Sequence, residues 1–301
     1  MSAVASAVLF GISSTLNKIA LENVNPTVAA GLIYFIGGIV LFGIHLSPLC
    51  NRVLALFGTS ETETKIARKD LVVLAFVILC GSIAAPFLLL NGLNQTSAIN
   101  ASLLLNAESL FTALIALSFL KERCSKGEYL GIFMLLLGVV FVTTNGDFGR
   151  LTLMENVAGN LAVIGACLFW GIDNNLSKFL SKKRDILMVT GLKCFIGGAV
   201  LLIISVLVGI SFYVPLVSIP YLLSVGALSI ALSILLFLFS LRKIGSMRTG
   251  MIFSTSSLFG AVLAFLILKE TFTVIQVVAG IVMLLGVYVI YRKCQPPSKQ
   301  F

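Results

Sequence analysis

The stretch LLLNAESLFT, residues 103–112, places an acidic residue near the middle of an apolar segment that runs from about Ala98 to Leu120. A segment of this length can cross the hydrocarbon core of a bilayer as a helix. An acid at the centre of a spanning helix costs roughly 2.5–3.5 kcal/mol on insertion scales for an aspartate-like group, and it is tolerated where it faces protein or a wet cavity. Glu108 is therefore the first candidate for a functional residue.

The composition of the whole chain is that of an integral membrane protein. Of its 301 residues, 58% are hydrophobic and 11% are charged, and the mean hydropathy is +1.09. Soluble domains carry about 25% charged residues. A sliding window of about 19 residues finds several apolar segments. They cover 2–21, 27–47, 71–93, 97–120, 127–145, 157–180, 186–210, 217–241, 246–268 and 273–291, which predicts an all-α protein with ten transmembrane helices.

The positions of the basic residues predict the orientation of the chain in the membrane. With the N-terminus inside, 16 of the 21 Lys and Arg residues fall in inner loops and the C-terminal tail, and only Arg150 and Lys269 fall in outer loops. This is the positive-inside pattern, so we expect both termini to be cytoplasmic. A bacterial or archaeal inner membrane is the default. The net charge of +9 then reflects topology and contact with anionic lipid, and it is weak evidence for nucleic acid.

The chain also repeats itself. At an offset of 160, the sequence FIGG of residues 35–38 recurs at residues 195–198, with 13 identities over positions 11–45. At an offset of 148, SLF of residues 109–111 recurs at residues 257–259, with 12 identities over positions 109–139. The sequence thus predicts two related halves, residues 1–145 and 157–292, followed by a cytoplasmic tail, residues 293–301.

Each half holds five predicted helices. Because five is odd, the second half must enter the membrane upside down relative to the first. Inverted repeats are typical of secondary transporters, which place the substrate site near the midplane between the repeats. Transport by alternating access is therefore the first functional hypothesis.

The sequence resembles the EamA-type permeases of the drug/metabolite transporter superfamily. The first segment, AVLFGI at residues 7–12, is similar to the family's first-helix signature. The two glutamate-ended segments, residues 109–122 and 259–270, are similar to its fourth and ninth helices. The family commonly has a proline near the start of the fourth-helix motif, where this chain has Ala107 and Glu108. That difference is similar to one branch of the family, which carries an Asn-x-Glu motif there. The resemblance implies a metabolite permease, often an exporter, and says nothing of its substrate.

In the branch with the Asn-x-Glu motif, the sixth helix carries the sequence DNNL, here residues 173–176. The seventh helix has a lysine like Lys193, and the ninth has the sequence RTG, here residues 248–250. We expect Asp173, Asn174 and Lys193 to contact the substrate, because intramembrane charges of both signs would match an amino-acid-like solute. Arg248 is the weaker candidate, because an interfacial arginine at the start of a helix is ordinary.

Asn106 and Glu108 lie about 200° apart on a helical wheel, so both cannot face one cavity squarely. We expect one to face the lumen and the other to bond a neighbouring helix, and which does which stays open. Intramembrane acids usually mark ion or substrate paths, and a buried carboxyl group suits a reversible proton carrier. The alternative is a structural carboxylate that holds two helices in register.

The polar run Asp173, Asn174, Asn175 covers most of a helix circumference and favours local unwinding into a cavity, the alternative being a frayed cytoplasmic helix end. Lys18 and Lys178 are equivalent in the repeat. We interpret both as helix-end lysines that reach opposite membrane faces, with an anion-binding pair as the alternative. Asn174 and Lys178 share one helix face at i, i+4. Lys193 lies about two turns into its helix and needs a partner, for which Asp173 and Glu108 are the nearest in kind.

Other chemistries have little support in the sequence. It has no G-x-x-x-x-G-K-[ST] motif, one histidine, six cysteines without close spacing and no catalytic triad motif. We therefore predict no enzyme activity, no cofactor and no metal site.

The sequence favours a transporter, proton-coupled or an exchanger, for a small polar metabolite such as an amino acid. The main alternative is an exchanger of organic phosphates or nucleotide sugars, in which Lys18, Lys178, Lys193 and Arg248 would converge on phosphate. A membrane scaffold or an enzyme of lipid metabolism is less favoured.

Overall fold

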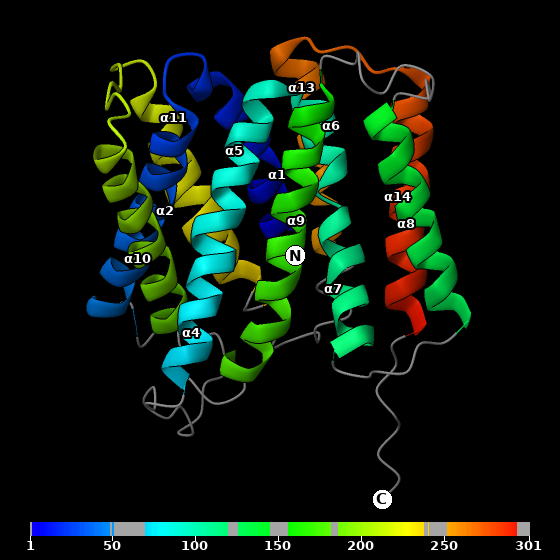
Figure 1. Cartoon of the computed structure of the whole chain (residues 1–301), viewed down its shortest axis with the longest axis horizontal. Coiled ribbons are helices and arrows are strands. Elements are labelled where there is room, and N and C mark those ends of the chain that lie inside the picture. The colour runs from blue at the N-terminus through cyan, green and yellow to red at the C-terminus, as the bar shows by residue number, and fades with distance from the viewer. Residues whose placement is uncertain are drawn as a thin grey trace, which may run out of the picture.

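The computed structural model describes residues 2–48, 50, 70–119, 126–144, 156–181, 186–237, 240 and 252–293. Within these ranges the chain forms a bundle of ten helical stretches that run roughly side by side (Figure 1). Seven of them are long and apolar enough to span a membrane, and shorter apolar helices cover 129–142, 252–268 and 274–289. The prediction of an all-helical chain with ten helices is confirmed.

The first five stretches are α1 (Ser2–Leu21), α2 (Pro26–Leu46), a third built from α4 (Asp70–Ile78), the π-helical η1 (Leu79–Ala84) and α5 (Ala85–Gln95), a fourth built from α6 (Ala98–Leu104) and α7 (Ala107–Phe119), and α8 (Lys126–Thr144). The next five are α9 (Val157–Ser181), α10 (Ile186–Leu207), a stretch that begins with α11 (Ile219–Ser224) and the π-helical η3 (Val225–Leu232), α13 (Ser256–Leu268) and α14 (Val274–Lys293).

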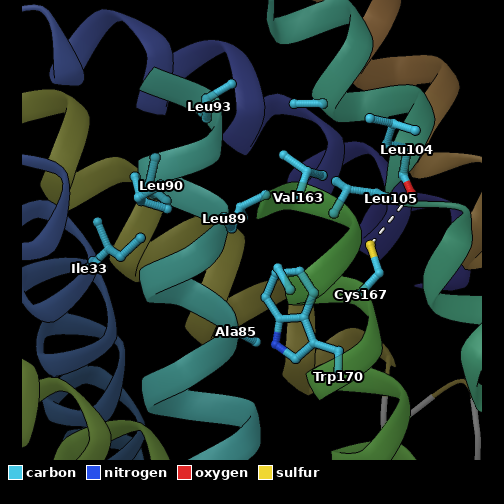
Figure 2. Packing of buried hydrophobic residues seen from close by; sticks show 14 of the residues in the cluster. Ile33, Ala85, Leu89, Leu90, Leu93, Leu104, Leu105, Val163, Cys167 and Trp170 are labelled. Atoms are coloured by element: carbon cyan, nitrogen blue, oxygen red, sulfur yellow. Dashed lines mark hydrogen bonds between the residues drawn. The ribbon is translucent and has the colours of Figure 1, made fainter. Parts of the chain in front are cut away.

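Helices that are distant in the sequence form the main contacts. The helix α2 packs along α10, α8 packs along α14, and α9 lies against both α5 and α7. The α8–α14 pair stands at one edge of the bundle in Figure 1. Buried apolar side chains fill the contact between α5 and α9, among them Leu89 and Val163 (Figure 2). In a membrane such contacts stabilise through close packing, since lipid tails are as apolar as the side chains.

The contact between α2 and α10 is reciprocal. A side chain at Gly38 would meet the backbone of Phe195, and a side chain at Gly198 would meet the backbone of Phe35. The rings of Phe35 and Phe195 stack with their centroids 4.8 Å apart. Gly38 and Gly198 are 160 residues apart, as are the two phenylalanines, so equivalent positions exchange partners as they would around a two-fold axis.

Other contacts repeat at the two offsets. Gly11 approaches Phe259 and Gly260, whereas Gly171 approaches Phe111 and Thr112. The π-helical segment η1 also falls within η3 when it is shifted by 148 residues. These paired contacts support the proposal that the chain consists of two inverted, structurally related halves.

The close approach at Gly198 carries a first prediction. Because an added methyl group would meet backbone atoms of Gly31 and Phe35, the two helices must separate to accept it. We expect Gly198→Ala to lower the free energy of unfolding by roughly 1–3 kcal/mol, the usual cost of overpacking. The measurement is unfolding by titration with SDS in mixed micelles.

Gly43 provides the matched control, because an added methyl group there meets nothing within 4 Å. Alanine also has the higher helix propensity. Gly43→Ala should leave stability unchanged or raise it slightly. Equal losses in both variants would contradict the packing explanation.

Candidate functional site

An ion pair between α9 and α10 is the centre of the site. The Lys193 Nζ lies 2.5 Å from the Asp173 Oδ2, and both side chains are largely buried. The Ser177 hydroxyl donates to the other carboxylate oxygen, Oδ1, at 2.9 Å. Removing two charges from water is costly, and the cost is offset only when both are well paired and hydrogen-bonded. The structure thus gives Lys193 a partner that the sequence named.

A second acidic group of the site, Glu108, lies on α7 and contacts α9. The Asn174 Nδ2 donates to the Glu108 Oε1 at 2.7 Å, and its second contact is the Thr112 hydroxyl at 3.4 Å. Glu108 is half-buried and Asn174 is exposed. A carboxyl group accepts such a bond both when it is ionised and when it is protonated, so this contact leaves Glu108 able to exchange a proton.

The polar run on α9 contacts three different neighbours. Asp173 reaches Lys193 on α10, Asn174 reaches Glu108 on α7, and Asn175 donates to the carbonyl oxygens of Thr112 and Gly171. Successive residues of an α-helix point about 100° apart, which explains the spread. The prediction that the helix unwinds here is wrong: α9 is continuous through these residues, since each polar side chain finds a partner around it.

The break lies in the fourth stretch instead, between α6 and α7. Backbone bonds from the amides of Asn106 and Glu108 go to the carbonyls three residues earlier, at 3.2 and 3.1 Å. The tightened turn frees the Leu104 carbonyl, which accepts a weak bond from the Cys167 thiol at 3.5 Å (Figure 2). Glu108 consequently sits in the first turn of α7, where the helix dipole favours negative charge.

Asn106 takes the bonding role between helices. Its side chain is 3% exposed and donates to the Ser257 hydroxyl at 2.9 Å. Nearby, the hydroxyls of Ser109 and Ser254 lie 3.4 Å apart. Ser254 is 148 residues beyond Asn106, and Ser257 is 148 beyond Ser109, so the two stretches exchange equivalent bonds where they cross. Of the pair Asn106 and Glu108, Asn106 is the residue enclosed between helices.

A π-helical turn supports the ion pair from the third stretch. A side chain at Gly81, in η1, would meet the carboxylate of Asp173. The Trp170 indole N–H donates to the Gly81 carbonyl at 3.1 Å, and its ring lies beside Ala85 (Figure 2). Tyr34, buried on α2, lies within electrostatic range of Asp173 and Glu108. The π turn thus places Gly81, which has no side chain, against the Asp173 carboxylate. Single π turns within α-helices are frequent at functional sites.

Sequence reasoning missed several residues of this site: Tyr34, Gly81, Thr112, Trp170 and Ser177. Ser177 had a detectable signal, since it follows Asp173 by four residues and so shares its helix face. Trp170 is the single tryptophan of the chain and precedes Asp173 by almost one turn. The roles of Gly81 and Tyr34 depend on tertiary contacts that leave no local pattern.

Gly81 leads to a second prediction. We expect Gly81→Ala to displace the Asp173 carboxylate and weaken the ion pair, with a loss of roughly 1–3 kcal/mol in the free energy of unfolding. Gly165→Ala is the control, because its methyl group would meet only the end of the flexible Leu88 side chain. SDS titration compares the two variants. If the Gly81 variant is no less stable than the Gly165 variant, the proposed support of Asp173 is wrong.

Lys18 does not join this site. Its Nζ donates to the carbonyls of Leu93 and Thr96, at 2.6 and 2.5 Å, at the end of α5. Cations are favourable there because helix C-terminal carbonyls lack partners. Leu93 is 12 residues beyond Gly81, or about 18 Å along a helix. Lys18 is thus a helix-end lysine that is bonded to a neighbouring helix and lies far from Gly81, which contacts Asp173.

Two of the candidates from the sequence remain, Lys178 and Arg248. The side chain of Lys178 and the whole of Arg248 fall outside the described residues. Their proposed roles stay predictions. Among the described side chains, no three His, Cys, Asp or Glu residues gather as a metal site would require.

Comparison with known proteins assigns the chain to a family. The model of the EamA-like transporter family matches residues 1–144 and, separately, 157–292. A protein named as an uncharacterized transporter, from Methanothermobacter thermautotrophicus, is 43% identical over 294 residues, which are 97% of this chain and 85% of that protein. Solute carrier family 35 member F6 of Mus musculus is 30% identical over 132 residues, which are 42% of this chain and 35% of that protein.

A solved crystal structure shares the fold. It covers 95% of this chain and 94% of its own, with a TM-score of 0.66 at 17% sequence identity. The matches to the family model and to the archaeal relative extend over nearly the whole length of the described helices. The chain belongs to the EamA-like transporter family of the drug/metabolite transporter superfamily, and it is a multi-pass membrane transporter, not an enzyme.

Proposed function

We propose that the protein is a secondary transporter of a small zwitterionic metabolite, such as an amino acid, coupled to protons through Glu108. The observation that carries this is that adjacent residues of α9, Asp173 and Asn174, contact Lys193 and Glu108 respectively. Intramembrane charges of this kind usually mark a substrate or proton path. The two inverted halves would supply alternating access around the site. The family resemblance makes export the direction to test first.

Charge balance supports a zwitterion over an anion. Asp173 and Lys193 neutralise one another, so a solute with a single charge would leave one of them without a partner. A zwitterion can replace both partners at once: its ammonium group binds Asp173 and its carboxylate binds Lys193. Asn174 lies next to Asp173 on α9 and offers an amide on the exposed side.

The alternative, an exchanger of organic phosphates, has less support. It requires several cations to converge on one phosphate. Lys18 is bonded to the carbonyls at the end of α5, and a phosphate bound to Lys193 would leave the Asp173 carboxylate without its cationic partner. One described lysine near the site is a weak basis for binding a dianion.

Thermal unfolding with a panel of solutes tests the proposal. A ligand that binds only the folded protein stabilises it by RT ln(1 + [L]/Kd), about 2.7 kcal/mol at one hundred times Kd. The panel compares amino acids with matched amines, carboxylates, organic phosphates and nucleotide sugars. We expect amino acids to raise the unfolding temperature and their singly charged analogues to fail. Stabilisation by phosphorylated solutes alone would replace this proposal with the exchanger.

A further inference from the structure

A network of polar contacts joins the two halves at the end of the bundle away from the ion pair. Two backbone amides at the start of α6, those of Ala98 and Ile99, donate to the two carboxylate oxygens of Glu270 at 2.8 and 2.9 Å. Glu270 follows α13, in the second half of the chain. The carboxylate therefore occupies the positive end of a helix from the other half, where anions are favoured.

Two side-chain hydrogen bonds also join the first half of the chain to the second at this end. The Thr96 hydroxyl donates to the Asn160 Oδ1 at 2.6 Å, and the Gln276 Nε2 donates to the Asn100 Oδ1 at 2.7 Å. All four side chains are at least nine-tenths buried. Buried polar groups are expensive to leave unpaired, so these bonds hold the ends of the helices together while they last.

The chain takes an unusual conformation to place Glu270. Lys269 has a φ of 59°, in the left-handed region, and is the one non-glycine residue with positive φ among those described. This conformation costs roughly 1–2 kcal/mol in a residue with a side chain. It ends α13 and turns the chain so that the next residue reaches α6. A left-handed residue, usually glycine, is a common way for a helix to end, and here the residue is a lysine.

The network is distant from the site and lies at one end. Asn160 precedes Asp173 by 13 residues of a continuous helix, or about 20 Å. The C-terminal ends of α5 and α13 and the N-terminal ends of α6 and α9 meet there, at the top of Figure 1. The distribution of basic residues predicts that this end faces the outside of the cell.

We propose that the contact of Glu270 with the amides of Ala98 and Ile99 is the outer gate, which is closed in this structure. The proposal rests on the proposed transport function. The groups of helices that move cannot be the two sequence halves, because α5 and α7 pack along α9 and α1 packs along α13. In alternating access such groups rock, and a contact between groups at one end, such as that of α13 with α6, must break when that end opens. Glu270 is the strongest tie because it is charged and accepts two bonds. Its loss should shift the population toward the outward-open state.

Access to a reporter cysteine tests the gate without measuring transport. The six native cysteines are replaced by alanine and Ser109, half-buried beside the site, by cysteine. A membrane-impermeant maleimide is then added outside intact cells. We expect Glu270→Ala to raise the labelling rate on the order of tenfold, the ratio that corresponds to loss of one charged hydrogen bond. Glu270→Gln should raise it less, because the amide oxygen keeps one of the two bonds.

Glu22→Gln is the matched control. Glu22 is an exposed acid that follows α1 at the same end, and among the described residues no side-chain hydrogen bond joins it to the second half. Its labelling rate should equal that of the parent protein. The gate is wrong if Glu270→Ala, eluting as a monodisperse protein, labels at the parent rate, or if Glu22→Gln accelerates labelling equally. Should the alanine variant fail to fold, Glu270→Gln takes its place, and a parent-like labelling rate in that variant would overturn the proposal.

The result is separable from the transport proposal. Labelling requires no solute, so faster labelling of the Glu270 variants supports the gate even if no solute in the panel binds. Conversely, solute binding combined with unchanged labelling leaves the transport proposal standing and removes the gate.

Discussion

Lys193→Met is expected to lower the free energy of unfolding by roughly 3–5 kcal/mol, the usual cost of removing one member of a buried ion pair. The Asp173 carboxylate would keep its bond from Ser177 but lose the ammonium group that lies 2.5 Å from it. An uncompensated charge in this apolar setting has few ways to be relieved. Solute binding, measured as thermal stabilisation, should also be lost. SDS titration and the solute panel measure the two effects on the same preparation.

The double variant Asp173→Asn, Lys193→Met separates stability from function. With both charges gone, no ion is left unpaired, and we expect stability to return to within about 1 kcal/mol of the parent protein. Solute stabilisation should stay absent, because the groups that would bind the zwitterion are gone. If the double variant still binds amino acids as the parent does, the pair has a structural role only.

Glu108→Gln is expected to abolish solute accumulation driven by a pH gradient. The rate of solute exchange at equal pH should stay within a few-fold of the parent rate. Glutamine keeps an oxygen that accepts the bond from Asn174, now 2.7 Å from the Glu108 Oε1. It cannot gain or lose a proton. Proteoliposomes loaded with solute measure exchange, and empty ones with an imposed gradient measure accumulation. We expect at least a tenfold loss in the second assay, the scale of a single essential proton carrier.

The control for this variant is again Glu22→Gln, the same chemical change at an exposed acid outside the site. It should accumulate solute as the parent does. Gradient-driven accumulation that persists in Glu108→Gln would assign coupling to another group. If Glu108→Gln loses both solute exchange and gradient-driven accumulation, Glu108 is a structural carboxylate.

Much of this architecture follows from patterns that hydropathy and charge reveal. Helices in a membrane satisfy their own backbone, so apolar length predicts them well. Charges within those helices are costly, which is why Asp173, Lys193 and Glu108 stand out before any contact is known. The partner of Lys193 could be named because few acids are available inside the bundle.

The helix breaks at Asn106 and stays continuous at residues 173–175, where the polar run favours unwinding. No proline or glycine marks the turn near Asn106; it is held by bonds to Leu103 and to Ser257, 151 residues away. The run at residues 173–175 looks unfavourable for a helix until each side chain finds its partner on another helix. Local sequence cannot show which polar residues will be satisfied by distant ones.

The outer network escaped prediction for a related reason. Glu270 ends one of the two glutamate-ended segments and Thr96 is an ordinary residue for a helix end, but neither pattern names a partner. Their significance depends on the meeting of two helix ends that are about 170 residues apart in the chain. The π turn of η1 has one local mark, Pro86 near the start of α5, which lacks the amide of an ordinary helix residue.

Proton movement caused by the solute itself tests the central claim most directly. Proteoliposomes enclose a pH-sensitive dye, with equal pH on both sides, and receive the amino acid that stabilises the protein most. Coupled transport predicts a change of internal pH in step with solute entry, absent in Glu108→Gln and in vesicles without protein. Solute entry with no change of internal pH would contradict the account.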